Sequence, residues 1–188
     1  GTRDSVASRG LGDVYKRQVS KALKKEKDAI KFLKRSLTHF SKSHLTHYHL
    51  GLLLKKHSKI GEGISHLKEA VKFNAEFDDA YYYLARFLEE QDDYEAAKEH
   101  YLKALARNHK HRDASFYLGL LMKKLNMMEE AKAYMEKTIE ADQNFTEAYY
   151  YLGMILNDPA DYASARKCYL TALDINPKYF MALSLIHI

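Results

Sequence analysis

The sequence is poor in the residues that form cross-links or interrupt helices. Its 188 residues include one cysteine, two prolines, eight glycines and no tryptophan. The single cysteine (Cys168) excludes an internal disulfide, and a zinc site built from thiolates would need more cysteines than this chain has. The scarcity of proline and glycine excludes a collagen-like or linker-dominated chain and favours long helices. No apolar run approaches the roughly 18 residues of a membrane span.

The two ends of the chain correspond to complementary DNA strings. Residues 13–18 read DVYKRQ and residues 183–188 read LSLIHI. The codons GAT GTG TAT AAG AGA CAG and CTG TCT CTT ATA CAC ATC would encode them, and these strings are reverse complements that resemble the transposase end of a sequencing-library adapter. We therefore interpret residues 1–18 and 183–188 as translated adapter, and 19–182 as an internal gene fragment. The native N-terminus is then missing, and a cytoplasmic location is an expectation only.

A period of 34 residues organises most of the chain. Leucines recur at this spacing, and a small residue follows each of them: Leu50 and Gly51, Leu84 and Ala85, Leu118 and Gly119, Leu152 and Gly153. Thirteen residues after each leucine comes another small residue, with a large one four positions later: Gly63 and Leu67, Ala97 and Tyr101, Ala131 and Met135, Ala165 and Tyr169. The period predicts four copies of one unit, at 44–77, 78–111, 112–145 and 146–179.

Each copy has the pattern of a helical hairpin. The leucine and the small residue beside it share one face of a first helix, where the small side chain lets a second helix approach closely. The second helix presents small, large and small residues at i, i+4 and i+7, which form one apolar stripe. Short polar turns such as QDDYE (91–95) separate the two helices. One hairpin cannot bury its faces alone, so we expect neighbouring hairpins to stack.

These residues resemble the tetratricopeptide repeat family. The family's W-x2-LG-x2-Y…A-x3-F…A-x4-P pattern is represented by YYYLARFL…AAKEHYLKA (81–104) and by YYYLGMIL…ARKCYLTALDINP (149–177). Over the four copies, the position of the family's tryptophan is held by His47, Tyr81, Ser115 and Tyr149. The resemblance implies an all-α fold, a right-handed α-solenoid (superhelix) of antiparallel helix pairs. It extends to a partial copy at 19–43, where we expect the second helix only, and to the start of a truncated copy at 180–182.

The resemblance also implies that the first helices line a concave groove. Positions one and two before each key leucine, and two after it, would point into that groove, and most of them hold aromatic rings. Tyrosine suits a binding surface because it offers a large apolar area and a hydroxyl at low entropic cost. In a competing interpretation some rings pack between neighbouring hairpins, as we expect for Tyr81 and Tyr149. The candidate partner-binding residues are Tyr48, His49, Tyr82, Tyr83, Arg86, Phe116, Tyr117, Tyr150 and Tyr151.

Other chemistry has weaker support in the sequence. His44, His47 and His49 form an H-x2-H-x-H cluster, but the last two would lie on different helix faces, so we expect no metal site. The chain has no Gly-rich phosphate loop, H-E-x-x-H, C-x-x-C or nucleophile elbow, so we predict no catalytic residue, no cofactor and no small-molecule substrate. Residues 19–43 carry a net charge of +6, which is typical of a solvated helix face. RNA, an acidic protein or a membrane surface is the alternative partner there.

We therefore expect a non-catalytic scaffold that binds a protein or peptide segment in the tyrosine-rich groove. The net charge of residues 19–182 is only +3, which argues against nucleic acid as the main partner. The absence of a long apolar run argues against a membrane span. The alternative is a targeting arm of a larger enzyme whose catalytic domain lies outside the fragment, as in family members fused to glycosyltransferases, kinases or phosphatases.

Overall fold

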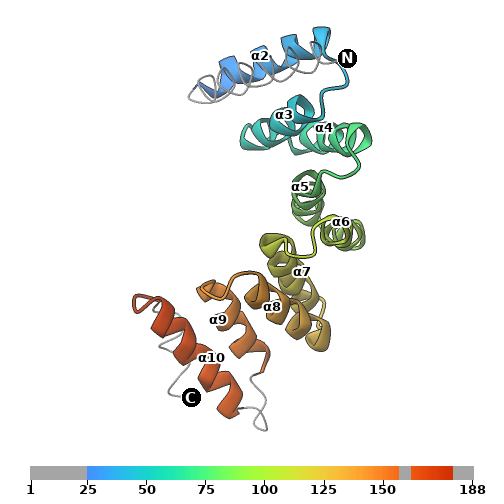
Figure 1. Ribbon diagram of the computed structural model, residues 1–188. Helices are drawn as coiled ribbons and strands as arrows, with labels where there is room; N and C mark the ends of the chain where they lie inside the picture. The colour runs from blue at the N-terminus through green and yellow to red at the C-terminus, as the bar shows by residue number, and fades with distance from the viewer. Residues whose placement is uncertain (1–24, 157–161, 180–188) are drawn as a thin grey trace, which may run out of the picture. The chain divides into compact units, whose positions relative to one another are not determined.

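A computed structural model describes residues 25–156 and 162–179. Over these ranges the chain forms nine α-helices and no strand (Figure 1). The helices are α2 (Glu26–His39), α3 (His44–Lys56), α4 (Ile60–Phe73), α5 (Asp78–Glu89), α6 (Tyr94–Arg107), α7 (Arg112–Lys124), α8 (Met128–Ala141), α9 (Thr146–Ile155) and α10 (Tyr162–Ile175). Successive helices joined by short turns form the all-α helical repeat solenoid that the sequence predicts. Within the same ranges, no helix has the length and apolar character needed to cross a membrane.

Several sequence-based predictions concern residues that lie outside this description. They are the adapter interpretation of 1–18 and 183–188, the truncated copy at 180–182, and the polar turn at 157–161. The chain divides into two compact units, 1–76 and 77–188, which we call unit 1 and unit 2.

Unit 1 is built from α2, α3 and α4, with α3 in contact with both of the other helices. Ala29 and Leu33 of α2 join three leucines of α3 in one buried cluster, completed by Leu50, Leu53 and Leu54. Helix α2 spans Glu26–His39, inside the segment 19–43 where the sequence leads us to expect a second helix of a partial copy. The apolar face of α2 is thus covered by the first helix of the following pair.

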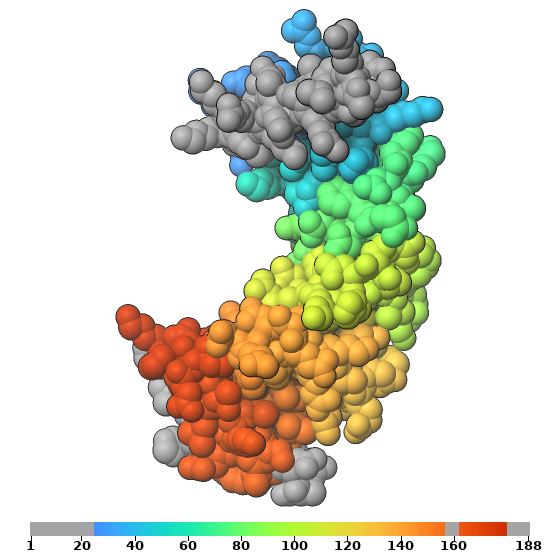
Figure 2. Space-filling model, viewed as in Figure 1, coloured from blue at the N-terminus to red at the C-terminus, as the bar shows by residue number. Residues whose placement is uncertain are grey.

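Unit 2 contains three helix pairs, α5 with α6, α7 with α8, and α9 with α10. Consecutive pairs are joined by contacts of α6 with α7 and of α8 with α9. The first helices also touch one another, α5 with α7 and α7 with α9. In the space-filling view these pairs form adjoining bands in chain order, from green to red (Figure 2). The first helices of unit 2 therefore form one continuous row, which is the surface that positions the candidate site.

Small residues set the distance between the helices of a pair. A Cβ atom added at Gly51 would lie 3.0 Å from Cγ of Leu67, and one added at Gly153 would lie 2.6 Å from Cε1 of Tyr169. Both distances are shorter than an ordinary van der Waals contact, so the large side chain of the second helix rests directly against the backbone of the first. This is the close approach that the repeated small and large positions predict.

The turn inside each of the first three helix pairs has one conformation. Ser58, Asp92 and Asn126, spaced by 34 residues, all have left-handed backbone, with φ of 59°, 61° and 62°. The next backbone N–H reaches back to a carbonyl near the end of the first helix, as in the 3.0 Å bond from Lys59 N to Leu54 O. This pattern is the Schellman motif, in which a left-handed residue closes the helix end and satisfies its last carbonyls. It turns the chain back at the same point in each of these pairs.

Candidate partner-binding surface

The nine candidate residues lie on first helices, where the sequence places them. Tyr48 and His49 belong to α3 of unit 1, are half-buried, and contact each other edge to face with ring centroids 5.1 Å apart. The other seven belong to α5, α7 and α9 of unit 2. Apart from Arg86, these seven residues are aromatic. The exposed fraction of their side chains divides the six rings into two groups.

The first group consists of the rings two positions before the key leucine. Tyr82, Phe116 and Tyr150 keep only 8%, 6% and 7% of their surface exposed. We call them the buried rings. Since so little of each ring is exposed, these three rings offer little area for contact with a partner. They instead pack beneath the surface of unit 2 and support it. The competing interpretation, in which some rings pack between hairpins, therefore applies to this position in unit 2.

The second group consists of the rings one position before the key leucine. Tyr83, Tyr117 and Tyr151 are half-buried, and we call them the tyrosine row. The ring of Tyr117 lies 5.3 Å from Phe116 of its own helix and 5.9 Å from Tyr82 of the preceding repeat. Tyr151 has the same two supports, at 5.2 Å from Tyr150 and 5.7 Å from Phe116. Edge-to-face and tilted contacts of this kind hold each ring in one orientation.

A further set of rings, which the sequence reasoning missed, completes this arrangement. His111, Phe145 and Tyr179 stand in the loops after each pair, and their ring centroids lie 5.1, 4.9 and 5.5 Å from Tyr82, Phe116 and Tyr150. The signal was available, because an aromatic ring recurs here at the same 34-residue spacing. Each loop ring covers a buried ring and so helps to keep it away from solvent.

A side-chain turn places each loop ring. The side-chain Oδ1 of Asn108, Asp142 and Asn176 accepts a hydrogen bond from the backbone N–H two residues later, at 3.2, 3.0 and 3.1 Å. Asparagine and aspartate favour such turns because the short polar side chain mimics a backbone carbonyl. The loop ring is the third residue after the asparagine or aspartate that begins each turn.

Arg86 interacts with the tyrosine row directly. Its guanidinium carbon lies 3.6 Å from the ring centroid of Tyr117, which is a close cation–π contact. Its Nη1 lies 3.5 Å from Oε2 of Glu89, and the hydroxyl of Tyr101 donates a 2.7 Å hydrogen bond to that same oxygen. The arginine is therefore fixed between a carboxylate on its own helix and a ring of the next repeat.

Carboxylates accompany the tyrosine row. Asp79, Asp113 and Glu147 each stand four residues before a row tyrosine, on the same helix face. We call them the carboxylate row. Burial raises the pKa of Tyr83, and the negative charges of Asp79 and Asp113 raise it further. The phenol of Tyr83 is therefore neutral at physiological pH.

The pKa of Tyr151 is raised in the same way. Burial makes the largest contribution, the neighbouring Tyr150 and Tyr117 come next, and Glu147 adds to them. The charges of the carboxylate row thus act on two of the three row tyrosines, Tyr83 and Tyr151. The surface thus combines half-buried tyrosine rings with negative charge.

The histidines of unit 1 are engaged in a hydrogen-bonded pair. His47, which is 8% exposed, lies with Nδ1 3.0 Å from Nδ1 of His66 and with Nε2 3.0 Å from the carbonyl oxygen of Ser41. The carbonyl can only accept, so Nε2–H of His47 donates to it, and the two Nδ1 atoms of His47 and His66 share a second hydrogen bond. In the parts of the chain that the structure describes, no group of three or more His, Cys, Asp or Glu side chains could hold a metal ion.

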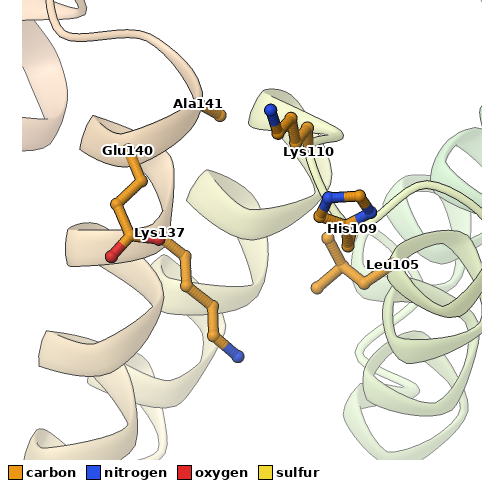
Figure 3. A pocket seen from close by; sticks show the side chains of 6 residues that line it. All are labelled: Leu105, His109, Lys110, Lys137, Glu140 and Ala141. Atoms are coloured by element: carbon orange, nitrogen blue, oxygen red, sulfur yellow. The ribbon is translucent and has the colours of Figure 1, made fainter.

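A separate cavity lies on the second helices of unit 2. It has a volume of about 260 Å³ and lies between the end of α6 and the end of α8 (Figure 3). Its lining residues are Leu105, His109, Lys110, Lys137, Glu140 and Ala141. None of them is a candidate residue, and both signs of charge are present at its edge. The cavity has no part in the tyrosine row, which belongs to the first helices.

Comparison with known families identifies the repeat. Three sequence models of the tetratricopeptide repeat match the chain, at residues 48–108 and 88–122, at 113–144, and at 146–179. The chain belongs to the tetratricopeptide repeat family. Proteins with this repeat bind proteins or peptides, and the repeat fold is generally a non-catalytic interaction scaffold. No curated protein matches the sequence.

Solved structures support the same assignment. A crystal structure of MamA has a TM-score of 0.78 at 26% sequence identity, covering 85% of this chain and 95% of that one. YrrB, whose structure is described as a TPR protein with an unusual peptide-binding site, has a TM-score of 0.74 at 20% identity over 89% of this chain and 87% of its own. The Pseudomonas aeruginosa protein pilF has a TM-score of 0.73 at 20% identity, covering 97% and 80%. The last two likenesses concern the fold alone.

Proposed function

We propose that this tetratricopeptide repeat protein is a non-catalytic scaffold and that the tyrosine row binds an extended segment of a partner protein. The observation that carries the proposal is the support of the row. Three half-buried tyrosines recur at one repeat position, and those of the second and third pairs of unit 2 are held by buried rings from two successive repeats. Rings that are fixed before binding lose little conformational entropy when a partner covers them.

The remaining candidate residues have supporting roles in this proposal. Arg86 fixes the ring of Tyr117. The buried rings pack against the tyrosine row and hold its rings in place. Tyr48 and His49 hold the equivalent positions of the first repeat, and we propose that they offer the same kind of contact in unit 1. We further propose that the protein binds no cofactor and no small-molecule substrate, and that nucleic acid is not its main partner. A targeting arm of a larger enzyme would use the same surface.

The proposal is tested with peptides selected on the full chain from a random display library. Selected peptides should bind with dissociation constants on the order of micromolar, because several modest aromatic contacts contribute. The double substitution Tyr83→Ala and Tyr117→Ala should abolish this binding while the helical circular dichroism persists. If the double variant loses helicity, Tyr83→Ala alone is measured, because it keeps the contact of Arg86 with Tyr117.

A matched control uses tyrosines of the second helices. Tyr134→Ala with Tyr162→Ala removes one half-buried and one exposed ring from α8 and α10, and should leave the binding of the selected peptides unchanged. Peptides that bind the tyrosine-row variant as tightly as the parent chain would place the site elsewhere and refute the proposal.

A further inference from the structure

The charge of the surface beside the tyrosine row indicates what kind of segment it binds. The three repeats of unit 2, at 78–111, 112–145 and 146–179, carry net charges of −3, −1 and −1. The carboxylate row places part of this negative charge within one helical turn of each row tyrosine. A partner that covers these rings must therefore approach three carboxylates at a regular spacing.

Two members of the carboxylate row have local side-chain partners that contact only one of the two carboxylate oxygens. Both contacts of Arg112 to Asp113, from Nε and Nη2 at 2.8 Å, fall on Oδ1. His111 likewise lies 3.3 Å from Oδ1 of Asp79. The side chains of Asp79 and Asp113 remain 53% and 40% exposed. Each Oδ2 is then able to accept a hydrogen bond from a cation of the partner.

Glu147 is the third member of the carboxylate row. It is the second residue of α9 and is partly exposed. Its charge reaches two tyrosines, since it contributes to the raised pKa of Tyr151 and to that of Tyr179, which is raised to about 12 with burial as the main cause. A cation bound here would lie against rings and a carboxylate together.

The chain already contains one example of such a contact. The guanidinium of Arg86 stacks on Tyr117 at 3.6 Å and faces the carboxylate of Glu89 at 3.5 Å. In this arrangement the ring face attracts the cation and the carboxylate compensates its charge. Two positions after the key leucine, the following repeats hold Leu120 and Met154 in place of arginine. In unit 2, the chain itself therefore provides a cation at this position in one repeat only. A partner can provide cations at the equivalent positions of the other two repeats.

We infer that the segment bound by the tyrosine row is basic, with lysine or arginine side chains that lie against the row rings and pair with the carboxylate row. This inference rests on the proposed function and adds the chemistry of the partner to it. An acidic segment would bring like charges together, and such a contact is repulsive. The phosphate backbone of RNA is disfavoured on this surface for the same reason.

The test measures fluorescence anisotropy of labelled dodecapeptides with the full chain. One peptide alternates arginine and serine, and its counterpart alternates glutamate and serine. The arginine peptide should bind at least about tenfold more tightly, a difference of about 1.4 kcal/mol, and its binding should weaken as salt is added. Equal binding of the two peptides, or no binding of the arginine peptide, overturns the inference.

Two variants locate the binding on the surface. Glu147→Gln should weaken binding of the arginine peptide about threefold, as expected for one partly exposed ion pair. Tyr151→Leu, which keeps much of the apolar volume and removes the ring quadrupole, should weaken it about two- to fivefold. The matched control is Glu129→Gln, because Glu129 is the second residue of the second helix α8. An equal effect of Glu129→Gln and Glu147→Gln overturns the inference.

The two proposals can fail separately. If selected peptides depend on Tyr83 and Tyr117 while the arginine peptide shows no preference, only the basic character of the segment is wrong. If the selected peptides do not depend on these tyrosines, the proposed function is wrong and this inference falls with it.

Discussion

Gly153 determines how closely α9 and α10 approach each other. A Cβ atom there would lie 2.6 Å from Cε1 and 2.9 Å from Cδ1 and Cζ of Tyr169. The ring of Tyr169 is rigid and buried, so either the ring or one of the two helices would have to move. The equivalent positions of α5 and α6 hold Ala85 and Tyr101, both fully buried. A helix pair can therefore accept alanine at this position when the distance between its two helices is large enough for the extra methyl group.

Gly153→Ala should lower the free energy of unfolding by about 1–3 kcal/mol, the usual cost of overpacking a core, even though alanine is the better helix former. Gly61→Ala provides the control. Gly61 lies in α4, where an added Cβ has no atom within 4 Å, so it should stabilise by about 0.5–1 kcal/mol through helix propensity alone. Urea unfolding followed by circular dichroism measures both, and a Gly153→Ala chain as stable as the parent would contradict this packing.

The burial of His66 and of two other histidines makes unit 1 sensitive to acid. The pKa of His66 is lowered by burial first and then by His47 and Lys34, while Glu62 and Glu69 oppose the shift. Burial also lowers the pKa of His44 and of His49. Since the folded state disfavours these protons, the unfolded chain binds more of them, and stability is lost as the pH falls through the ordinary histidine pKa.

The urea midpoint should therefore decrease between pH 7.5 and pH 5.5, a range of about one unit on either side of the ordinary histidine pKa. His66→Gln should show a weaker pH dependence than the parent, because it removes one titrating group whose charged form the fold disfavours. His109→Gln changes an exposed histidine and should keep the parental dependence. Identical pH profiles for His66→Gln and the parent would show that protonation of His66 is not coupled to folding.

At the residue scale, the sequence predicts which helix a candidate side chain belongs to, but not its depth. Tyr82 and Tyr83 are adjacent and identical, and the resemblance to the repeat family implies that both face the groove. Their exposure differs because the next repeat supplies Tyr117, and the loop before it supplies His111, against Tyr82. Burial in a stack depends on the neighbouring repeat, and the pattern of one helix contains no information about that neighbour.

At the scale of elements, the helices and their turns follow the repeat closely. The small and large positions predict each described pair, and the polar segments between the helices of the first three pairs become turns. The left-handed turn residue was not predictable from its type, because Ser58, Asp92 and Asn126 differ and none is glycine. Only their shared position in the Schellman motif explains a common conformation.

Ser58→Gly should stabilise the chain by about 0.5–1 kcal/mol, because glycine adopts positive φ without the steric cost that serine has there. Asn126→Gly should gain less, since asparagine tolerates the left-handed region better than serine does. The urea midpoints of the two variants give the comparison. A Ser58→Gly chain less stable than the parent would show that this turn carries no such strain.

At the scale of the whole chain, one set of roles recurs with the repeat. In unit 2 a carboxylate, a buried ring, a row tyrosine and a loop ring follow one another every 34 residues. The sequence predicts the solenoid because every copy obeys the same packing rule. It does not predict the surface to the same degree, because contacts such as that of Arg86 with Tyr117 join residues of different copies.

The central claim is that the tyrosine row forms the binding surface, and nuclear magnetic resonance of the chain with isotope-labelled tyrosine rings tests it most directly. On titration with a peptide selected on the chain, the ring signals of Tyr83, Tyr117 and Tyr151 should shift and then saturate together. Those of Tyr134 and Tyr162, on the second helices, should stay in place. Shifts confined to Tyr134 and Tyr162 would contradict the claim and assign binding to the second helices.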